Sequence, residues 1–294
     1  MVDSELSILA WLTCSRVYHD GMKPCISQAT TMPHSFADDV GFYADAGCPD
    51  MEVWLTKLEN HLAEHGADAT QQLLETRQMR LAAAAYQGGL LLSQGEQRKA
   101  HFDHFKQRLN LCQQFRIPTL VLVADFVEKV DQTALERSVV SLKQAAQWAA
   151  AFDVKLALEF RGSATFCASL DTAVALVTMT EEDNVGICFD VFHYYTGPSK
   201  FEDLALLNRN NLAHVHICDV AGISREIASD SDRVLPGDGD YQLVPILDHF
   251  RNIGYEGYIS LELFNPTLWQ ANAKQVSEIG ITALRKLMGL AENN

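Results

Sequence analysis

Four side chains that can bind a metal ion stand where four apolar runs of this sequence end. They are Glu159, Asp190, His216 and Glu262, and each ends or directly follows a run rich in Val, Leu, Ile or Phe. A buried strand that ends in a lone carboxylate or imidazole makes sense if that end opens onto solvent and a ligand. Three carboxylates and one imidazole favour Mn²⁺, Mg²⁺ or Co²⁺, and they are also compatible with Zn²⁺.

A divalent cation with open coordination positions suggests a particular chemistry. The adjacent carbonyl and hydroxyl oxygens of a sugar could chelate it. The ion would then polarise the carbonyl, acidify the neighbouring C–H and stabilise the enediolate left when that proton departs. A glutamate on either face of the sugar could take or return the proton. A lone Glu or His at a strand end is more often a structural group, but four such positions on successive strands are difficult to explain separately.

The segments that would position these side chains alternate between strand-like and helical patterns from Lys23 onward. Short apolar runs predict strands at 23–32, 50–58, 80–86, 117–126, 154–160, 184–192, 212–220 and 257–263. Helical patterns fall at 35–47, 69–79, 96–116, 134–152, 169–182, 200–210, 240–254 and 272–291. In the first of these, Ser35 is suited to cap the helix and Gly47 to end it.

Eight pairs of apolar strand and helix predict a parallel sheet covered by helices. At this length such a sheet most naturally closes on itself, which predicts an α/β fold of one domain, a single (β/α)8 TIM barrel. The barrel covers residues 23–294, and residues 1–22 form an N-terminal extension. An open doubly wound sheet is the alternative. It is disfavoured because no GxGxxG turn follows an early strand.

The barrel prediction brings the four side chains together. Active sites of such barrels lie at the carboxyl ends of the strands. Since side chains alternate along a strand, Asp190, His216 and Glu262 would point into the mouth together with Glu159. Strands five and eight lie on roughly opposite sides of the ring, so the two glutamates would flank a bound molecule.

Composition narrows the class of protein. A formal net charge of −15 and a pI near 5.0 disfavour nucleic-acid binding. The seven cysteines form no CxxC pair, which fits reduced thiols and argues against a disulfide framework. We therefore expect a cytoplasmic protein. No run approaches the roughly 20 apolar residues of a membrane span, and the first residues lack the basic character of a signal peptide.

Several blocks resemble the sugar phosphate isomerase/epimerase family, the xylose-isomerase-like barrels that include ketose 3-epimerases, hydroxypyruvate isomerase and inosose-processing enzymes. The blocks are GCPDMEVW at 47–54, LALEF, GICFDVFH, HVHICD, RVLPGDG at 233–239, and YQLVPILDHFRNIGYEGYISLEL at 241–263. The resemblance starts near Pro24 and is strongest from residue 154 to the end. The last block is the most specific match.

The resemblance implies that Glu159, Asp190, His216 and Glu262 bind the metal and that the two glutamates double as the acid/base pair. It also implies that His193 and Arg233 hold substrate oxygens. Arg233 could then stabilise the enediolate charge. His193 has a second interpretation, as a group that orients Asp190.

Four further residues are weaker candidates. Glu52 and Trp54 share a strand face and are candidates for substrate binding, with Trp54 as an apolar wall for a sugar; core packing explains Trp54 equally well. Arg161 could meet a substrate anion or a neighbouring acid. We expect His214 one layer deeper, where it packs or supports a ligand.

The sequence thus predicts a divalent-metal-dependent isomerase or epimerase of a ketose or related polyol ketone. We expect no nucleic-acid or membrane partner, and the sequence is compatible with a homo-oligomer. A dehydratase of the inosose or dehydroshikimate type is the alternative, because it begins with the same proton abstraction. An apurinic-site endonuclease of the endonuclease IV class is disfavoured, since AAAAYQGG and LVLVADF lack the histidines of a trinuclear zinc site. A non-catalytic sugar-binding protein is also disfavoured by the intact ligand set.

Overall fold

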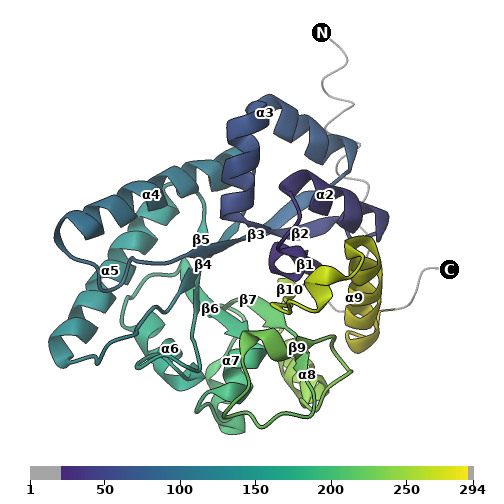
Figure 1. The fold of residues 1–294 in the computed structure, drawn as a ribbon. Coiled ribbons are helices and arrows are strands. Elements are labelled where there is room, and N and C mark those ends of the chain that lie inside the picture. Colours follow the sequence, from purple (N-terminus) through teal and green to yellow (C-terminus); the bar gives the residue numbers. More distant parts are fainter. Residues whose placement is uncertain (1–20, 291–294) are drawn as a thin grey trace.

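Eight parallel strands close on themselves in the computed structural model, which describes residues 21–290 (Figure 1). In chain order they are β1 Lys23–Ser27, β2 Asp50–Trp54, β3 Arg80–Gln87, β4 Thr119–Val123, β5 Lys155–Glu159, β6 Val185–Asp190, β7 Leu212–Ile217 and β10 Tyr258–Leu261. Each strand pairs with its chain neighbour, and β10 pairs with β1 to complete the ring. The predicted (β/α)8 barrel is therefore confirmed.

The helices surround this barrel on its outside (Figure 1). In the described part of the chain they are α2 Phe36–Asp45, α3 Leu55–Thr76, α4 Gly95–Gln114, α5 Gln132–Ala150, α6 Leu170–Thr178, α7 Val191–Thr196, α8 Leu243–Asn252 and α9 Ala273–Leu287. Short 3-10 turns occur at η1 Gln28–Thr31, η2 Phe201–Leu206, η3 Asp230–Asp232 and η4 Leu268–Gln270. None of the helices in residues 21–290 combines the length and apolarity needed to cross a membrane.

A small antiparallel pair stands beside the mouth of the barrel. It joins β8 Asp219–Val220 to β9 Arg233–Val234. The run predicted as one strand at 212–220 is therefore divided, because the chain leaves the barrel after Ile217 and pairs with β9 instead. The loop between β8 and β9 leaves the barrel and then returns to it. Its return places Arg233 at the mouth.

Other predicted boundaries also shift. The second strand ends at Trp54, and α3 begins at Leu55 rather than at 69. Leu55 and Leu58 are buried at helical spacing, so the helical pattern outweighs the apolar run. The helix predicted at 200–210 is the 3-10 turn η2. The predicted N-terminal extension, 1–22, lies outside the described residues except for its last two positions.

The two faces of the strands pack differently. Leu156 of β5 belongs to the main hydrophobic core together with helix residues such as Leu142 of α5. On the opposite face, Val121, Ala157 and Cys188 form a separate small cluster inside the barrel. These side chains fill the barrel directly before the strand ends. They support the polar groups that lie above them.

Helix α2 begins with the Ser35 cap that the sequence predicted. Ser35 accepts a hydrogen bond from the backbone N–H of Asp38 at 3.1 Å, and Asp38 accepts one from the N–H of Ser35 at 3.3 Å. This reciprocal capping box satisfies two N–H groups that the helix itself leaves without a partner.

We expect the substitution Ser35→Ala to lower the free energy of unfolding by about 1 kcal/mol, because the helix loses its cap. Urea denaturation followed by circular dichroism measures this change. Ser163→Ala, at an exposed loop position, is the control and should alter stability by less than about 0.5 kcal/mol. Equal effects of the two substitutions would contradict the capping role.

Candidate active site and metal centre

The four predicted metal ligands meet at the mouth of the barrel. Glu159 ends β5, Asp190 ends β6, His216 lies near the end of β7, and Glu262 directly follows β10. Each offers one ligand atom, and these atoms all lie within 4.8 Å of one another. All four residues are buried. The structure thus brings together every residue that the sequence nominated for the cation.

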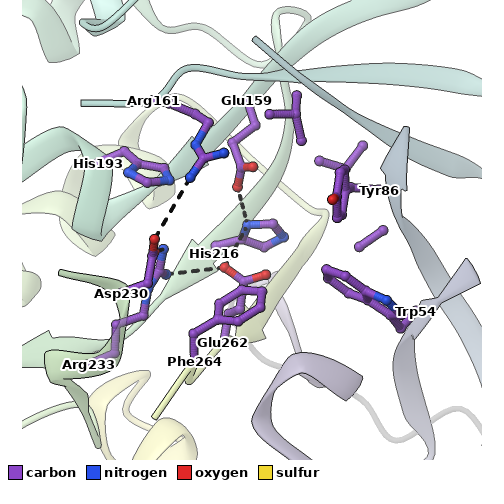
Figure 2. A pocket seen from close by; sticks show the side chains of 13 residues that line it. Trp54, Tyr86, Glu159, Arg161, His193, His216, Asp230, Arg233, Glu262 and Phe264 are labelled. Carbon is purple, nitrogen blue, oxygen red and sulfur yellow. Dashed lines mark hydrogen bonds and ion pairs between the residues drawn. The ribbon is translucent and has the colours of Figure 1, made fainter. Parts of the chain in front are cut away.

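His216 is at the centre of this group (Figure 2). Its Nδ1 atom lies 2.7 Å from Oε1 of Glu159, 3.3 Å from Oε2 of Glu262 and 4.0 Å from Oδ2 of Asp190. Strand register explains the proximity, since Asp190 is aligned with His216 across the β6–β7 pair. The four residues come from four adjacent strands, β5, β6, β7 and β10.

Arg233 neutralises part of the negative charge. Its guanidinium donates hydrogen bonds to Asp190 at 2.8 Å, to Glu262 at 3.1 Å and to Asp230 at 2.7 Å. The side chain is only 1% exposed, and its charged end lies 4.5 Å from the centre of the Phe192 ring. An arginine held by three acids is rigid, and it keeps the carboxylates oriented toward the mouth.

Burial and charge shift the pKa values of this cluster in different directions. Burial raises the pKa of Glu262 well above its usual range and outweighs the opposing effect of the neighbouring cations. Burial would raise the pKa of Asp190 too, but Arg233 lowers it to about 2. The pKa of His216 is raised well above normal, because the negative groups around the ring outweigh burial. Without a metal, protons on Glu262 and His216 therefore offset part of the negative charge of the cluster, and a divalent cation would take the place of these protons.

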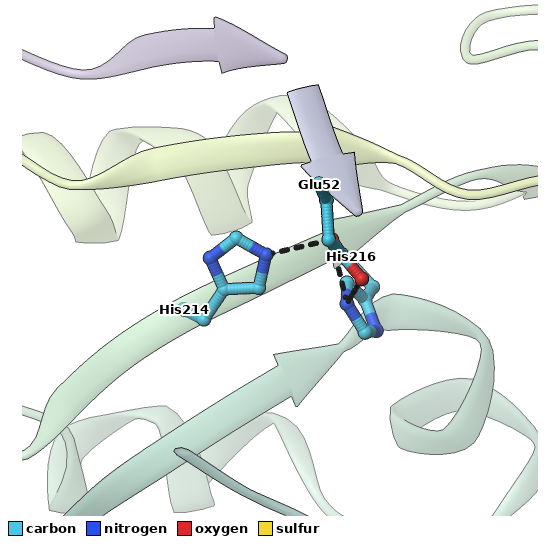
Figure 3. A group of neighbouring side chains, drawn as sticks. All are labelled: Glu52, His214 and His216. Carbon is cyan, nitrogen blue, oxygen red and sulfur yellow. Dashed lines mark hydrogen bonds and ion pairs between the residues drawn. The ribbon is translucent and has the colours of Figure 1, made fainter. Parts of the chain in front are cut away.

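A second layer lies beneath His216 (Figure 3). The carboxylate of Glu52, from β2, is within 2.8 Å of Nε2 of His214 and within 3.0 Å of Nε2 of His216. The sequence nominated Glu52 for substrate contact. The structure instead buries it completely, with its carboxylate turned to the two histidines. His214 lies one layer deeper, as expected, and supports Glu52.

A cavity of about 280 Å³ opens above the cluster. Its polar lining consists of Glu159, Arg161, His193, His216, Asp230, Arg233 and Glu262, and its apolar lining of Trp54, Ala85, Tyr86, Val121, Val123 and Phe264. In Figure 2 the rings of Trp54 and Tyr86 lie on one side of the acidic cluster, and Arg161, His193 and Asp230 lie on the other. A bound molecule would therefore meet an aromatic wall and a polar wall.

The aromatic wall is a packed unit. The ring centre of Trp54 lies 4.9 Å from that of Tyr86 and 5.8 Å from that of Phe264, both edge to face. The position of Trp54 agrees with the apolar wall that the sequence suggested. Such a surface suits the C–H face of a sugar or cyclic polyol.

The polar wall offers groups that the described protein leaves without a hydrogen bond. The Nδ1 atom of His193 and the Nε atom of Arg161 are buried and have no partner among the described residues. Nε2 of His193 is 3.8 Å from Asp190, too far for a hydrogen bond. His193 is thus available to a ligand, and the alternative role of orienting Asp190 has little support. Arg161 meets a neighbouring acid, Asp230, at 3.9 Å.

Residues 40–287 match the family described as xylose isomerase-like TIM barrel. The chain belongs to this family. Most of its length, including every strand end discussed above except that of β1, is covered by the match.

Among characterised relatives of this barrel are the inosose isomerases of Halalkalibacterium halodurans and Bacillus subtilis. Each is 27% identical over 262 residues, which is 86% of this chain and 92% or 93% of the relative. The fold also resembles solved structures. The IolI protein with a bound zinc atom has a TM-score of 0.86 at 24% identity and covers 91% of this chain and 98% of its own.

A D-psicose 3-epimerase solved in the presence of D-fructose has a TM-score of 0.72 at 20% identity and covers 91% of this chain and all of its own. A probable 3-DHS dehydratase from Bacillus anthracis has a TM-score of 0.71 at 17% identity, with 90% and 98% covered. At these identities the likeness concerns the barrel fold alone.

Six residues that line the cavity were not found from the sequence: Ala85, Tyr86, Val121, Val123, Asp230 and Phe264. Phe264 follows Glu262 by two positions, so strand alternation could have indicated it. Tyr86 lies near the end of β3 in an alanine-rich run that carries no polar signal. Asp230 belongs to the long loop between β8 and β9, where no periodicity exists.

We expect Arg233→Met to lower the free energy of unfolding by roughly 3 kcal/mol when a chelator is present. Asp190 and Glu262 then remain buried without the guanidinium that neutralises them. Urea denaturation with EDTA measures the loss. Arg161→Met is the matched control: that side chain is 40% exposed, and its loss should change stability by less than about 0.5 kcal/mol. If both variants were equally stable, the buried ion pairs would not be needed for the fold.

Proposed function

We propose that this chain is a divalent-metal-dependent isomerase or epimerase of a polyol ketone, with inosose as the first candidate substrate. The observation that carries the proposal is the convergence of Glu159, Asp190, His216 and Glu262 beneath a cavity of sugar size. Inosose isomerases that match over nearly their whole length support the substrate class. The six described cysteines are unpaired and buried, which fits the cytoplasm as the location.

The donor set fits a divalent cation. Three carboxylates and an imidazole, whose ligand atoms lie within 4.8 Å of one another, would hold the ion and leave positions open for oxygen ligands. Mn²⁺, Mg²⁺ and Co²⁺ suit the oxygen-rich set, and the zinc-bound IolI structure keeps Zn²⁺ among the candidates. When bound, the cation would supply Lewis acidity to a substrate carbonyl.

The protein residues supply the proton transfers. Glu159 and Glu262 reach the cavity from β5 and from the end of β10, which are separated by β6 and β7 around the ring. One carboxylate removes the proton from the carbon beside the carbonyl, and the electron pair of that C–H bond becomes the enediolate. Return of the proton to the former carbonyl carbon, with transfer of the hydroxyl proton from one oxygen to the other, moves the carbonyl to the adjacent carbon. Return to the same carbon from the other face gives the epimer.

Arg233 and His193 would assist by binding oxygens. Arg233 lines the cavity while its guanidinium holds Asp190 and Glu262, so it presents positive charge near the enediolate. His193 presents the free Nδ1 atom to a hydroxyl. The aromatic wall around Trp54 would cover one face of the substrate and exclude water.

The charges of the cavity favour a neutral substrate. Arg233 is already committed to three acids, and Arg161 lies near Asp230. Among residues 21–290, those that line the cavity include no lysine. A phosphate group would therefore meet carboxylates, and the loosely held cation there, Arg161, is shared with Asp230. This argues for an unphosphorylated polyol ketone.

Dehydration is the second candidate function, because His193 could protonate a departing hydroxyl on the same enediolate. Its product differs in mass by one water, so mass spectrometry of inosose or dehydroshikimate after incubation separates the two reactions. A nuclease role has less support: His193 and His216 are the only histidines among the described residues that line the cavity.

The exchange of a substrate proton with solvent tests the proposed reaction. With Mn²⁺ and inosose in D₂O, we expect deuterium to enter the carbon beside the carbonyl, and we expect a chelator to stop this exchange. Glu262→Gln should slow the exchange at saturating metal by roughly 100-fold or more, since the base is lost. NMR or mass spectrometry measures the incorporation.

Glu59→Gln is the control for removal of a glutamate charge, because Glu59 pairs with Arg108 outside the cavity. Its exchange rate should equal that of the unmodified protein. Unchanged exchange in Glu262→Gln would refute the acid/base assignment.

A second prediction concerns substrate charge. If the protein accepts D-fructose, kcat/KM for D-fructose 6-phosphate should be at least about tenfold lower, because burying an unpaired charge is unfavourable. Asp230→Asn should reduce this difference in kcat/KM, because Arg161 then loses its acidic neighbour and can bind the phosphate. Steady-state kinetics with both ketoses measures it, and a preference for the phosphate would show that the cavity binds an anion.

A further inference from the structure

Glu52 forms a buried link between two histidines of the same strand (Figure 3). Its Oε2 atom lies 2.8 Å from Nε2 of His214, and its Oε1 atom lies 3.0 Å from Nε2 of His216. The three side chains are at most 1% exposed. They form one hydrogen-bonded unit below the cavity.

The chemistry of this unit determines where the protons are. An ionised carboxylate can only accept hydrogen bonds, so both Nε2 atoms must carry a hydrogen. Nδ1 of His216 faces Glu159 and Glu262, so this nitrogen also carries a hydrogen when no metal is bound. A cation that binds Nδ1 replaces that proton, and Glu52 holds the remaining hydrogen on Nε2. Glu52 therefore selects the tautomer that can bind a cation.

The orientation of Glu52 is itself fixed. Glu52 is aligned with Ser27 across the β1–β2 pair, and the Ser27 hydroxyl donates to Oε1 at 3.4 Å. The rings of His214 and His216 meet edge to face, with centres 5.2 Å apart. Rotation of either ring would break a hydrogen bond to Glu52 and this ring contact.

We propose that Glu52 is a positioning residue that fixes the tautomer and orientation of His216 for cation binding, and that His214 holds Glu52 in place. This inference rests on the proposed function. It replaces the substrate contact expected from the sequence, because Glu52 is fully buried beneath His216 and its carboxylate is engaged by both rings.

Glu52→Gln is the direct test, because it preserves shape but removes one acceptor. Oε2 lies within hydrogen-bond distance of both Nε2 atoms, at 2.8 Å and 3.1 Å, and Oε1 lies 3.0 Å from that of His216. Whichever way the amide points, its NH₂ group therefore faces the Nε2–H of His216. Two donors then meet, and the contact that holds this ring is weakened. We expect the affinity for Mn²⁺ to fall between about 10-fold and 100-fold. Isothermal titration calorimetry measures it, and deuterium exchange should largely recover at saturating Mn²⁺.

Two further variants sharpen the test. His214→Phe keeps the ring volume but removes the donor to Glu52, and we expect it to weaken Mn²⁺ binding by roughly tenfold, the lower end of the range for supporting residues. It also serves if Glu52→Gln does not fold. Glu59→Gln, which removes a carboxylate of α3 that pairs with Arg108 of α4, should leave the affinity unchanged.

A second measurement reports the contacts of the two imidazole rings with Glu52 and needs no activity. In the metal-free protein, ¹⁵N NMR of the imidazoles should show that Glu52→Gln changes the ring environment of His216 or His214, and Glu59→Gln should not. Unchanged imidazole signals together with unchanged Mn²⁺ affinity in Glu52→Gln would overturn the proposal.

Two other results would also overturn it. If Glu52→Gln lost deuterium exchange at saturating Mn²⁺ while its Mn²⁺ affinity was unchanged, Glu52 would be a substrate contact. If the variant instead lost a second equivalent of bound metal, Glu52 would be a metal ligand. If the unmodified protein bound no cation, the proposed function would fail. The NMR result would then decide by itself whether Glu52 fixes His216.

Discussion

Closure of the barrel forces four strand ends to face one another in a space largely shielded from water. Glu159, Asp190 and Glu262 contribute carboxylates there, and repulsion among them would open the mouth if nothing balanced it. Arg233 supplies one fixed positive charge, held by three acids and covered by aromatic rings. A divalent cation among the carboxylates would supply the rest. The fold, the electrostatics and the proposed chemistry all depend on this compensation.

The interior of the barrel is organised in layers by the two-residue alternation of its strands. A small apolar cluster that includes Ala157 and Cys188 fills the barrel next to the charged groups. His214 lies one layer below His216 on the same strand, and Glu52 from β2 joins the two. A single strand thus provides a residue for the proposed metal centre and a residue that supports it, and each is held by a group from across the ring.

The walls of the cavity come partly from strand ends and partly from segments outside the barrel strands. Trp54 and Tyr86 lie at the ends of two neighbouring strands, and Phe264 and Asp230 lie in segments outside the barrel strands. Loop positions can change without disturbing the barrel. Relatives with the same barrel and different names, an isomerase, an epimerase and a dehydratase, are consistent with this division.

The sequence by itself determined the barrel, its strand order and the meeting of Asp190 and His216 with the two glutamates. Apolar runs and the alternation of side chains along a strand are local patterns. Closure of the strands into a barrel then brings their carboxyl ends together. It placed Glu52 on the correct strand but not against His214, and it gave no signal for Asp230 or Tyr86. Only the tertiary structure decided those contacts. They depend on the stagger between distant strands and on the path of a loop without periodicity, and neither is encoded in neighbouring residues.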